Sequence, residues 1–205
     1  MLVMDLKKTL PIFSYIFHPI FITFYGVLLY ILLSDLGINS LSILLLIQVI
    51  ILTILLPLSI YYLLKATGHI KSFTEATINE RKFPILLQAT FLFILLKFSG
   101  FIDDLLPLYF FMLGGLIASI VAFMLTFANF KVSLHMIGVC SLLIFIICLS
   151  VSLNIAIIPL IALMIVIVGN VASSRLFMKS HDTTELIAGS FIGLLSQVIL
   201  WQFYL

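Results

Sequence analysis

Long apolar runs fill most of this chain, and short polar clusters separate them. The runs of mostly hydrophobic residues occupy positions 16–34, 41–64, 85–98, 105–127, 136–152, 154–173 and 185–204. A helix that crosses a lipid bilayer needs roughly 20 such residues. Lipid offers no hydrogen bonds to the backbone, and the runs lack the alternation of barrel strands, so helices are expected. Because the run at 85–98 is short, the pattern predicts six or seven spans.

The composition supports lipid as the main solvent of the chain. Of the 205 residues, 64% are hydrophobic and 9% are charged, whereas soluble domains carry about 25% charged residues. Such a chain has too few polar groups to cover a globular surface in water. We therefore predict an all-α, polytopic membrane helix bundle that forms a single integral-membrane domain over residues 1–205.

The basic residues indicate an orientation. With seven spans and the N-terminus inside, nearly all lysines and arginines fall on one side, and Lys97 alone falls on the other, beside Asp103 and Asp104. This bias predicts that the first side is the cytoplasmic face of the cell (inner) membrane. The polar clusters at 65–84, 131–135 and 174–185 then share that face. No basic run of the kind that binds nucleic acid is present, so no nucleic-acid partner is expected.

The last polar cluster carries the strongest chemical signal. His181 and Glu185 are four residues apart, so they share one face of a helix. A carboxylate at that spacing holds an imidazole in one tautomer, which suits a nucleophilic or acid–base histidine. Arg175 precedes them, and its planar fork of donors matches a phosphate. Taken alone, Arg175 and Lys179 are also explained as basic residues at a cytoplasmic helix end.

The other two clusters contain groups that suit an anion. Lys131 and Ser133 can neutralise a phosphate and donate to it, and His135 can protonate a leaving group. A single histidine at a helix start is more often a capping or packing residue. In the first cluster, Arg81 is a candidate phosphate ligand, and Pro84 indicates the first turn of the next helix. Lys71 and Lys82 are interpreted as solvated positive-inside charges.

The last cluster resembles a known signature. Ser174 and Arg175, then five residues, His181, three residues and Glu185 are similar to the third signature of the type-2 phosphatidic acid phosphatase superfamily. That family usually has aspartate where Glu185 stands.

The other two signatures of the superfamily are altered. The second, proline-serine-glycine-histidine, appears as Val132-Ser133-Leu134-His135. In the first, Arg81 is not followed by proline, and Thr74 occupies the place of the lysine. The segment "NERKFP" and the "HPI" at 18–20 resemble short bacterial membrane members of this superfamily.

The resemblance implies hydrolysis of a lipid phosphate or diphosphate without a metal or other cofactor. His181 would attack phosphorus and form a phosphohistidine, Glu185 would orient it, and His135 would protonate the leaving oxygen. The remaining candidates, which would hold the phosphate oxygens, are Arg175, Ser133, Lys131 and Arg81. An isoprenyl diphosphate or a phosphatidic acid type lipid would both fit as substrate, and membrane lipids are the other expected partners.

A non-catalytic protein on the same fold, which binds or transports an anionic lipid, is the alternative. The altered first signature and Leu134 motivate it. His18 and His69 are expected to have interfacial or structural roles, and Asp103 and Asp104 to form an outer turn. Gly189 and Gly193 are four residues apart, a pattern typical of close helix packing.

Overall fold

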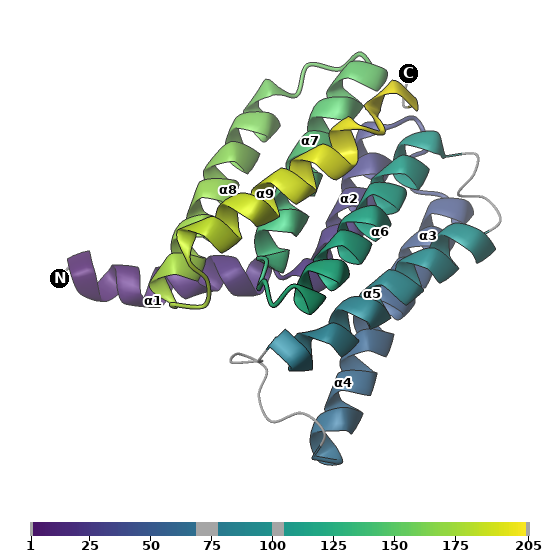
Figure 1. Cartoon of the computed structure of the whole chain (residues 1–205). Helices are drawn as coiled ribbons and strands as arrows, with labels where there is room; N and C mark the ends of the chain where they lie inside the picture. Colours follow the sequence, from purple (N-terminus) through teal and green to yellow (C-terminus); the bar gives the residue numbers. More distant parts are fainter. Residues whose placement is uncertain (1, 69–77, 100–104, 204–205) are drawn as a thin grey trace.

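The fold is a bundle of helices, with one helix lying across its end (Figure 1). The computed structural model describes residues 2–68, 78–99 and 105–203, so His69, Lys71, Thr74, Asp103 and Asp104 lie outside the described residues. No strand occurs in the described ranges. The elements are α1 (Leu2–Ile16), α2 (Pro19–Leu33), α3 (Ser40–Val49), η1 (Ile50–Leu55), α4 (Leu56–Ala66), α5 (Ile78–Phe98), α6 (Leu106–Phe127), α7 (Leu134–Ser152), α8 (Ile158–Phe177), α9 (Thr183–Val198) and η3 (Trp201–Phe203).

Five helices of the described chain are long and apolar enough to cross a membrane. They are Ser40–Ala66, Leu106–Phe127, Leu134–Ser152, Ile158–Phe177 and Thr183–Phe203. A sixth is added if Thr9–Ile16 and Pro19–Leu33 form one bent span. The prediction of an all-helical fold is therefore confirmed, and the apolar helices are compatible with a multi-pass membrane protein. The described helices give five or six candidate spans, where the sequence predicted six or seven. The sequence pattern counted the run at 85–98 as a span, whereas the helix that contains it is not among these candidates.

That run belongs to α5, which is longer and more polar than the sequence indicated. The helix begins at Ile78, so Pro84 lies inside it. The prediction that Pro84 marks the first turn of this helix is therefore wrong. Glu80 in the first turn favours this earlier start, because a carboxylate stabilises the positive end of a helix. The charges of Arg81, Lys82 and Lys97 interrupt the apolar run at both ends. Arg81 is thus held on a helix that packs along α6.

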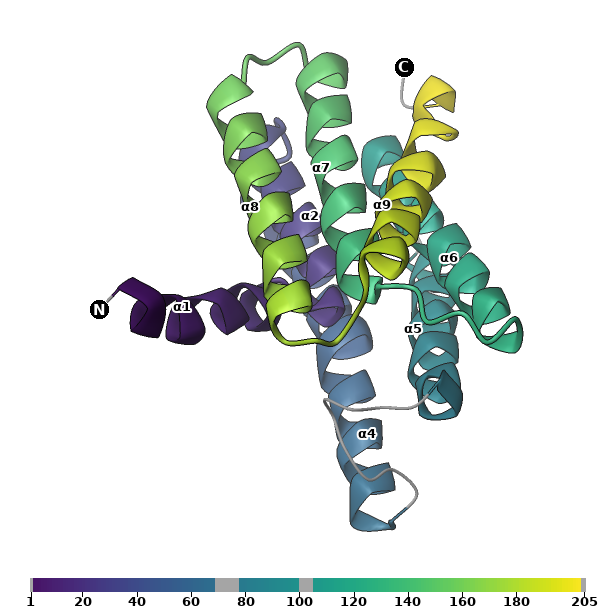
Figure 2. The same ribbon diagram turned by 60° about the vertical axis from the view of Figure 1, so that its left-hand side comes forward.

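The first predicted span, 16–34, begins at an elbow and is otherwise formed by α2. Segments Thr9–Ile16 and Pro19–Leu33 meet at an angle of 68°. His18 has extended backbone angles and caps α2, and Pro19 starts that helix. Proline suits a first helical position because it has no N–H to leave unpaired. As a result α1 lies across the end of the bundle, where it packs against α8 (Figure 2).

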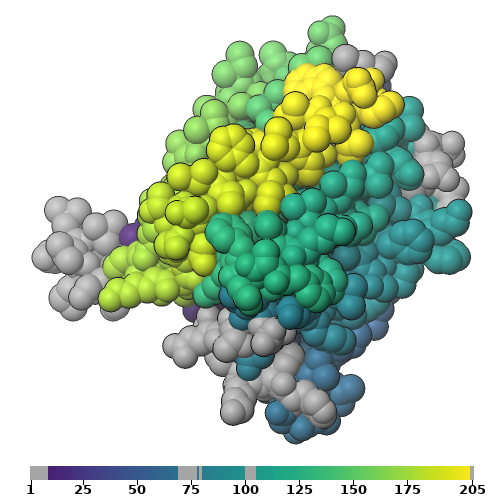
Figure 3. Space-filling model, viewed as in Figure 1, coloured from purple at the N-terminus to yellow at the C-terminus, as the bar shows by residue number. Residues whose placement is uncertain are grey.

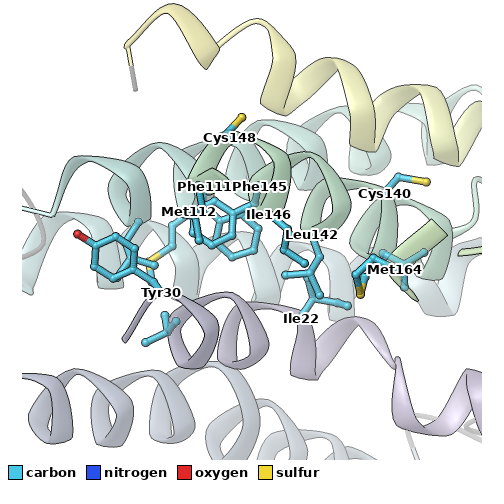
Figure 4. Packing of buried hydrophobic residues seen from close by; sticks show 14 of the residues in the cluster. Ile22, Tyr30, Phe111, Met112, Cys140, Leu142, Phe145, Ile146, Cys148 and Met164 are labelled. Carbon is cyan, nitrogen blue, oxygen red and sulfur yellow. The ribbon is translucent and has the colours of Figure 1, made fainter. Parts of the chain in front are cut away.

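Helix α7 forms the centre of the bundle and is the most buried of the spanning helices. It packs against α2, α6, α8 and α9. In the core between α2, α6 and α7, the rings of Phe111 and Phe145 stack with centroids 4.2 Å apart (Figure 4). Cys140 and Cys148 are both buried and free.

Helix α9 crosses one face of the bundle beside α6 (Figure 3) and lies unusually close to α7. A Cβ atom added to Gly189 would lie 2.6 Å from the backbone oxygen of Ser133. A Cβ atom added to Gly193 would collide with the backbone oxygen of Ile137. The two glycines therefore do what their spacing predicted, since they let two helix backbones touch.

We expect Gly193→Ala to destabilise the bundle, because the new methyl group meets a backbone oxygen that cannot rotate away. The cost should be about 1–3 kcal/mol, as for other overpacked sites. Thermal unfolding of the detergent-purified protein measures the change.

Gly169→Ala is the matched control. Gly169 lies in the middle of α8, and its added Cβ would meet nothing within 4 Å. Alanine is favoured over glycine inside a helix by about 1 kcal/mol, so this variant should be at least as stable as the wild type. Equal losses in both variants would contradict the packing argument.

Candidate functional site

The polar clusters that are distant in sequence meet at one end of the bundle. The start of α5, the start of α7, the end of α8 and the loop before α9 all lie at this end, together with the α1–α2 elbow (Figure 2). They border one cavity of about 580 Å³. Its polar lining includes Arg81, His135, Arg175 and His181, and also Glu80 and His18.

His181 and Glu185 form the tightest polar pair of this site. The Nδ1 atom of His181 lies 2.6 Å from Oε2 of Glu185. Since a carboxylate only accepts, Nδ1 carries the proton, and Nε2 presents its lone pair. Both ring position and tautomer are thereby fixed. The His181 side chain is 1% exposed, which keeps water from competing for this bond.

The start of α9 explains why this pair forms. Asp182 caps the helix by accepting from the backbone N–H of Glu185 at 2.8 Å. In return, the carboxylate of Glu185 accepts from the N–H of Asp182 at 3.3 Å. This capping box places Glu185 in the first turn, directly behind His181. The same carboxylate thus stabilises the helix end and orients the imidazole.

Arg81 contacts the second ring nitrogen of His181. Its Nη1 atom lies 3.5 Å from Nε2 of His181, although the two residues are 100 positions apart in the sequence. Helix α5 supplies Arg81 and α9 supplies the orienting carboxylate, so the imidazole lies between a guanidinium and a carboxylate. A ligand oxygen placed beside Nε2 would meet the guanidinium as well.

Arg175 is the second guanidinium of the cavity. It lies in the last turn of α8 and is 7% exposed. Among the described residues, its Nε atom has no hydrogen-bond partner. A buried donor without a partner is costly, so this orphan is a reason to expect an anionic ligand.

The charges around His181 set its protonation state. Burial, which is the largest cause, and the charges of Arg81, Arg175 and Lys131 together lower the pKa of His181 to about 3. A hydrogen bond with the backbone of Lys131 acts in the opposite direction. Burial and the charge of Arg81 also lower the pKa of Lys131. His181 is therefore neutral at physiological pH, which is the nucleophilic form of an imidazole.

Ser133 and Lys131 lie behind this surface and do not line the cavity. The N–H of Ser133 donates to the carbonyl oxygen of Glu185 at 3.3 Å, which ties the start of α7 to the start of α9. The Ser133 hydroxyl is fully buried and has no partner among the described residues. Lys131 is half-buried, within electrostatic reach of Arg81 and Glu185. These two candidates are near the site but do not border it.

His135 lines the cavity, and one of its nitrogens is already engaged. Its Nε2 atom lies 3.1 Å from the carbonyl oxygen of Ser14 in α1. A carbonyl only accepts, so Nε2 carries a proton. Ser14 is held in turn by the hydroxyl of Ser174, with 2.6 Å between the two oxygens. If His135 acts as an acid, the proton that it delivers is therefore on Nδ1.

The elbow contributes site residues that the sequence reasoning assigned elsewhere. We expected an interfacial or structural role for His18, and its cap of α2 is structural, but its side chain also borders the cavity. Its ring meets that of His135 edge to face, with centroids 5.1 Å apart. Ser14 had no signal in the sequence. The "HPI" segment at 18–20 was the only sign of His18, and its distance from the other clusters concealed the connection.

Positive charge at this site comes from side chains. Within the described ranges, no group of three or more His, Cys, Asp or Glu side chains is arranged to hold a metal ion. The cations Arg81 and Arg175 border the cavity, and Lys131 lies nearby. Such donors suit a phosphate, whose oxygens accept several hydrogen bonds at once.

Comparisons with known proteins give no match: neither a protein-family model, nor a curated protein, nor a solved structure is similar to this chain.

We expect His181 to stay neutral through the range in which an ordinary histidine, with a pKa of 6.5, gains its proton. Arg81→Ala should raise the pKa of His181, because it removes a positive charge beside the ring. The pKa of His181 is lower in the folded than in the unfolded protein, so the unfolded state gains this proton first as the pH falls below 6.5. The free energy of unfolding should therefore decrease over that range. NMR of isotope-labelled histidines, with His181→Gln to assign the signal, measures the titration.

Lys97→Ala is the charge-matched control for Arg81→Ala. Lys97 lies at the opposite end of α5, so its removal should leave the titration of His181 unchanged. A wild-type His181 that titrates near 6.5 would contradict the proposed electrostatics.

Proposed function

We propose that this protein is a membrane phosphatase, similar to the type-2 phosphatidic acid phosphatases, that hydrolyses a lipid phosphate or diphosphate through a phosphohistidine. The observation that carries the proposal is the neutral imidazole of His181, held at 2.6 Å by Glu185 and faced by Arg81 at 3.5 Å. A nucleophile, its orienting acid and a phosphate ligand thus meet at one point of a cavity. That arrangement supports phosphoryl transfer.

In the first step, the lone pair on Nε2 of His181 attacks phosphorus, and the bond to the leaving oxygen breaks. The imidazole becomes positively charged, and the carboxylate of Glu185 stabilises this charge. Arg81 and Arg175 neutralise the phosphate oxygens as charge develops on them. Binding of the anionic phosphate favours uptake of a proton from solvent at Nδ1 of His135. His135 then gives this proton to the leaving oxygen, which departs as a lipid alcohol or a lipid phosphate.

In the second step, water attacks phosphorus and breaks the bond to His181. His135, now neutral at Nδ1, accepts a proton from that water. Inorganic phosphate leaves, and both histidines return to their starting forms. Lys131 and the buried hydroxyl of Ser133 support this charge distribution from behind the cavity wall.

The walls of the cavity favour a lipid as the substrate. Away from the charged end, the lining is formed by apolar side chains of α2, α4, α5, α6 and α7, among them Ile22, Leu58, Leu92 and Phe111. Such a cavity has a charged end for a phosphate and an apolar chamber for a hydrocarbon chain. An isoprenyl diphosphate and a phosphatidic acid type lipid share this chemistry.

One observation favours the alternative of a protein that binds or transports an anionic lipid without hydrolysing it. The Nε2 atom of His135 is occupied by the Ser14 carbonyl, so one ring nitrogen is withdrawn from acid catalysis. Binding needs only the cations and the apolar chamber, whereas turnover needs a proton on Nδ1. Hydrolysis distinguishes the two functions.

His181→Ala should abolish phosphate release from lipid phosphates and diphosphates by the detergent-purified protein, because it removes the attacking atom. The wild type, given a labelled substrate and quenched rapidly, should carry an acid-labile phosphoryl group that the variant lacks. Phosphate release is measured with a chelator present.

Lys179→Asn is the control from the same loop. Lys179 is exposed and has a φ of 52°, which asparagine tolerates, so this variant should retain activity. Turnover by His181→Ala would exclude the nucleophile assignment. A wild type that binds lipid phosphates but releases none would instead support the binding protein.

We further propose that the cavity opens at the cytoplasmic face of the cell membrane, the side on which the N-terminus lies. Lys65, Arg81, Lys131 and Arg175 gather at this end of the bundle, whereas Lys97 is at the other. A membrane-impermeant thiol reagent should reach Lys179→Cys and Ala156→Cys from opposite sides. Ala156 is an exposed residue between α7 and α8, and the native cysteines are buried. Labelling of both from outside the cell would contradict this orientation.

A further inference from the structure

His18 is a titratable side chain of the cavity that the proposed reaction does not use. It stands at the elbow between α1 and α2, where its exposed side chain borders the same cavity as His135, Arg175 and His181. A histidine that only capped a helix would not need to face this cavity. Its position in the lining makes His18 a candidate ligand of whatever the cavity binds.

The hydrogen bond of the cap fixes which nitrogen of His18 carries the proton. Nδ1 accepts from the backbone N–H of Ile20 at 3.4 Å. In the neutral ring the proton is then on Nε2. Within the described residues, this N–H has no hydrogen-bond acceptor in the protein. His18 thus retains a donor for a ligand.

The neighbours of His18 place that donor between the charged and the apolar parts of the cavity. On one side is the ring of His135, edge to face at 5.1 Å. On the other side, Pro19, Ile20 and Ile22 continue along α2 as part of the apolar lining. A lipid whose phosphate lies at His181 and whose chain lies in the apolar chamber would occupy the same cavity that His18 borders.

We propose that His18 binds the leaving group of the substrate, by donating from Nε2 to an oxygen next to the one that His135 protonates. This inference rests on the proposed function and extends it. In a lipid diphosphate the acceptor is an oxygen of the inner phosphate, and in a monophosphate it is an ester or hydroxyl oxygen of the head group. His18 and His135 would act together on the leaving group, whereas Arg81 and Arg175 hold the transferred phosphate.

The elbow positions both imidazoles as a unit. His18 is fixed as the cap of α2, and His135 is fixed by the carbonyl of Ser14, one turn earlier in α1. The hydroxyl of Ser174, next to Arg175, holds Ser14 in place at 2.6 Å. Bending of the chain by 68° at this point thus brings a third histidine to residues of α7, α8 and the loop before α9.

His18→Asn separates binding from capping. The side-chain oxygen of asparagine caps a helix at least as well as other residues, so the elbow is preserved, but the Nε2 donor is lost. We expect kcat/KM for a short-chain lipid diphosphate to fall roughly 10- to 100-fold, the range for one hydrogen bond to a charged group. The thermal midpoint of the variant should stay close to that of the wild type.

His18→Ala is the companion variant, because it removes the cap together with the donor. Both variants should lose the same amount of kcat/KM, whereas only His18→Ala should lose thermal stability. Unchanged kcat/KM in a folded His18→Asn protein would overturn the proposal and leave His18 as a cap.

A binding measurement separates this inference from the proposed function. The probe is a non-hydrolysable phosphonate analogue of a lipid phosphate, titrated into the wild type and His18→Asn. Weaker binding by the variant would support His18 as a ligand even if the wild type releases no phosphate. Equal binding by both proteins would overturn it, and absence of binding to the wild type would overturn both proposals.

Discussion

The contact between the backbones of α7 and α9 is the constraint on which the candidate site depends. Gly189 and Gly193 have no side chain, so α9 can rest directly on the carbonyl oxygens of Ser133 and Ile137. That approach brings the start of α9 next to the start of α7, where the N–H of Ser133 reaches the carbonyl of Glu185. His181 and His135 face the same cavity because these two helix ends cannot move apart without losing the contact.

The charged groups buried at this end lower the stability of the protein, and packing elsewhere in the bundle offsets that loss. Arg81 and Arg175 are largely withdrawn from water, and one donor of Arg175 and the hydroxyl of Ser133 lack partners in the described chain. Buried donors of this kind lower stability unless a ligand satisfies them. The apolar core around Phe111 and Phe145 supplies the compensating stability. An anionic ligand would accept hydrogen bonds from these donors, so its binding would raise the stability of the protein.

The elbow between α1 and α2 has a different role from the spanning helices. Crossing the end of the bundle, α1 contributes a backbone carbonyl and the start of α2 contributes an imidazole. The hydroxyl–hydroxyl contact between Ser14 and Ser174 fastens this element beside Arg175. The site is therefore built from four separate parts of the chain, and α1 contributes to it although it does not run along the bundle.

The sequence by itself determined the class of the fold and the core of the candidate site. Apolar runs of membrane length require helices, and spacing alone put His181 and Glu185 on one helical turn, because both are local properties of the chain. It did not determine that 85–98 belongs to a longer and charged helix, or that Pro84 lies within it, since a charged helix that packs along a neighbour leaves no apolar pattern. Nor could it separate residues that border the cavity, such as Arg81, from those behind it, such as Ser133. Only the tertiary structure decided that His18 and Ser14 join the site, because a bend in the chain, and no pattern in the sequence, brings them to His135.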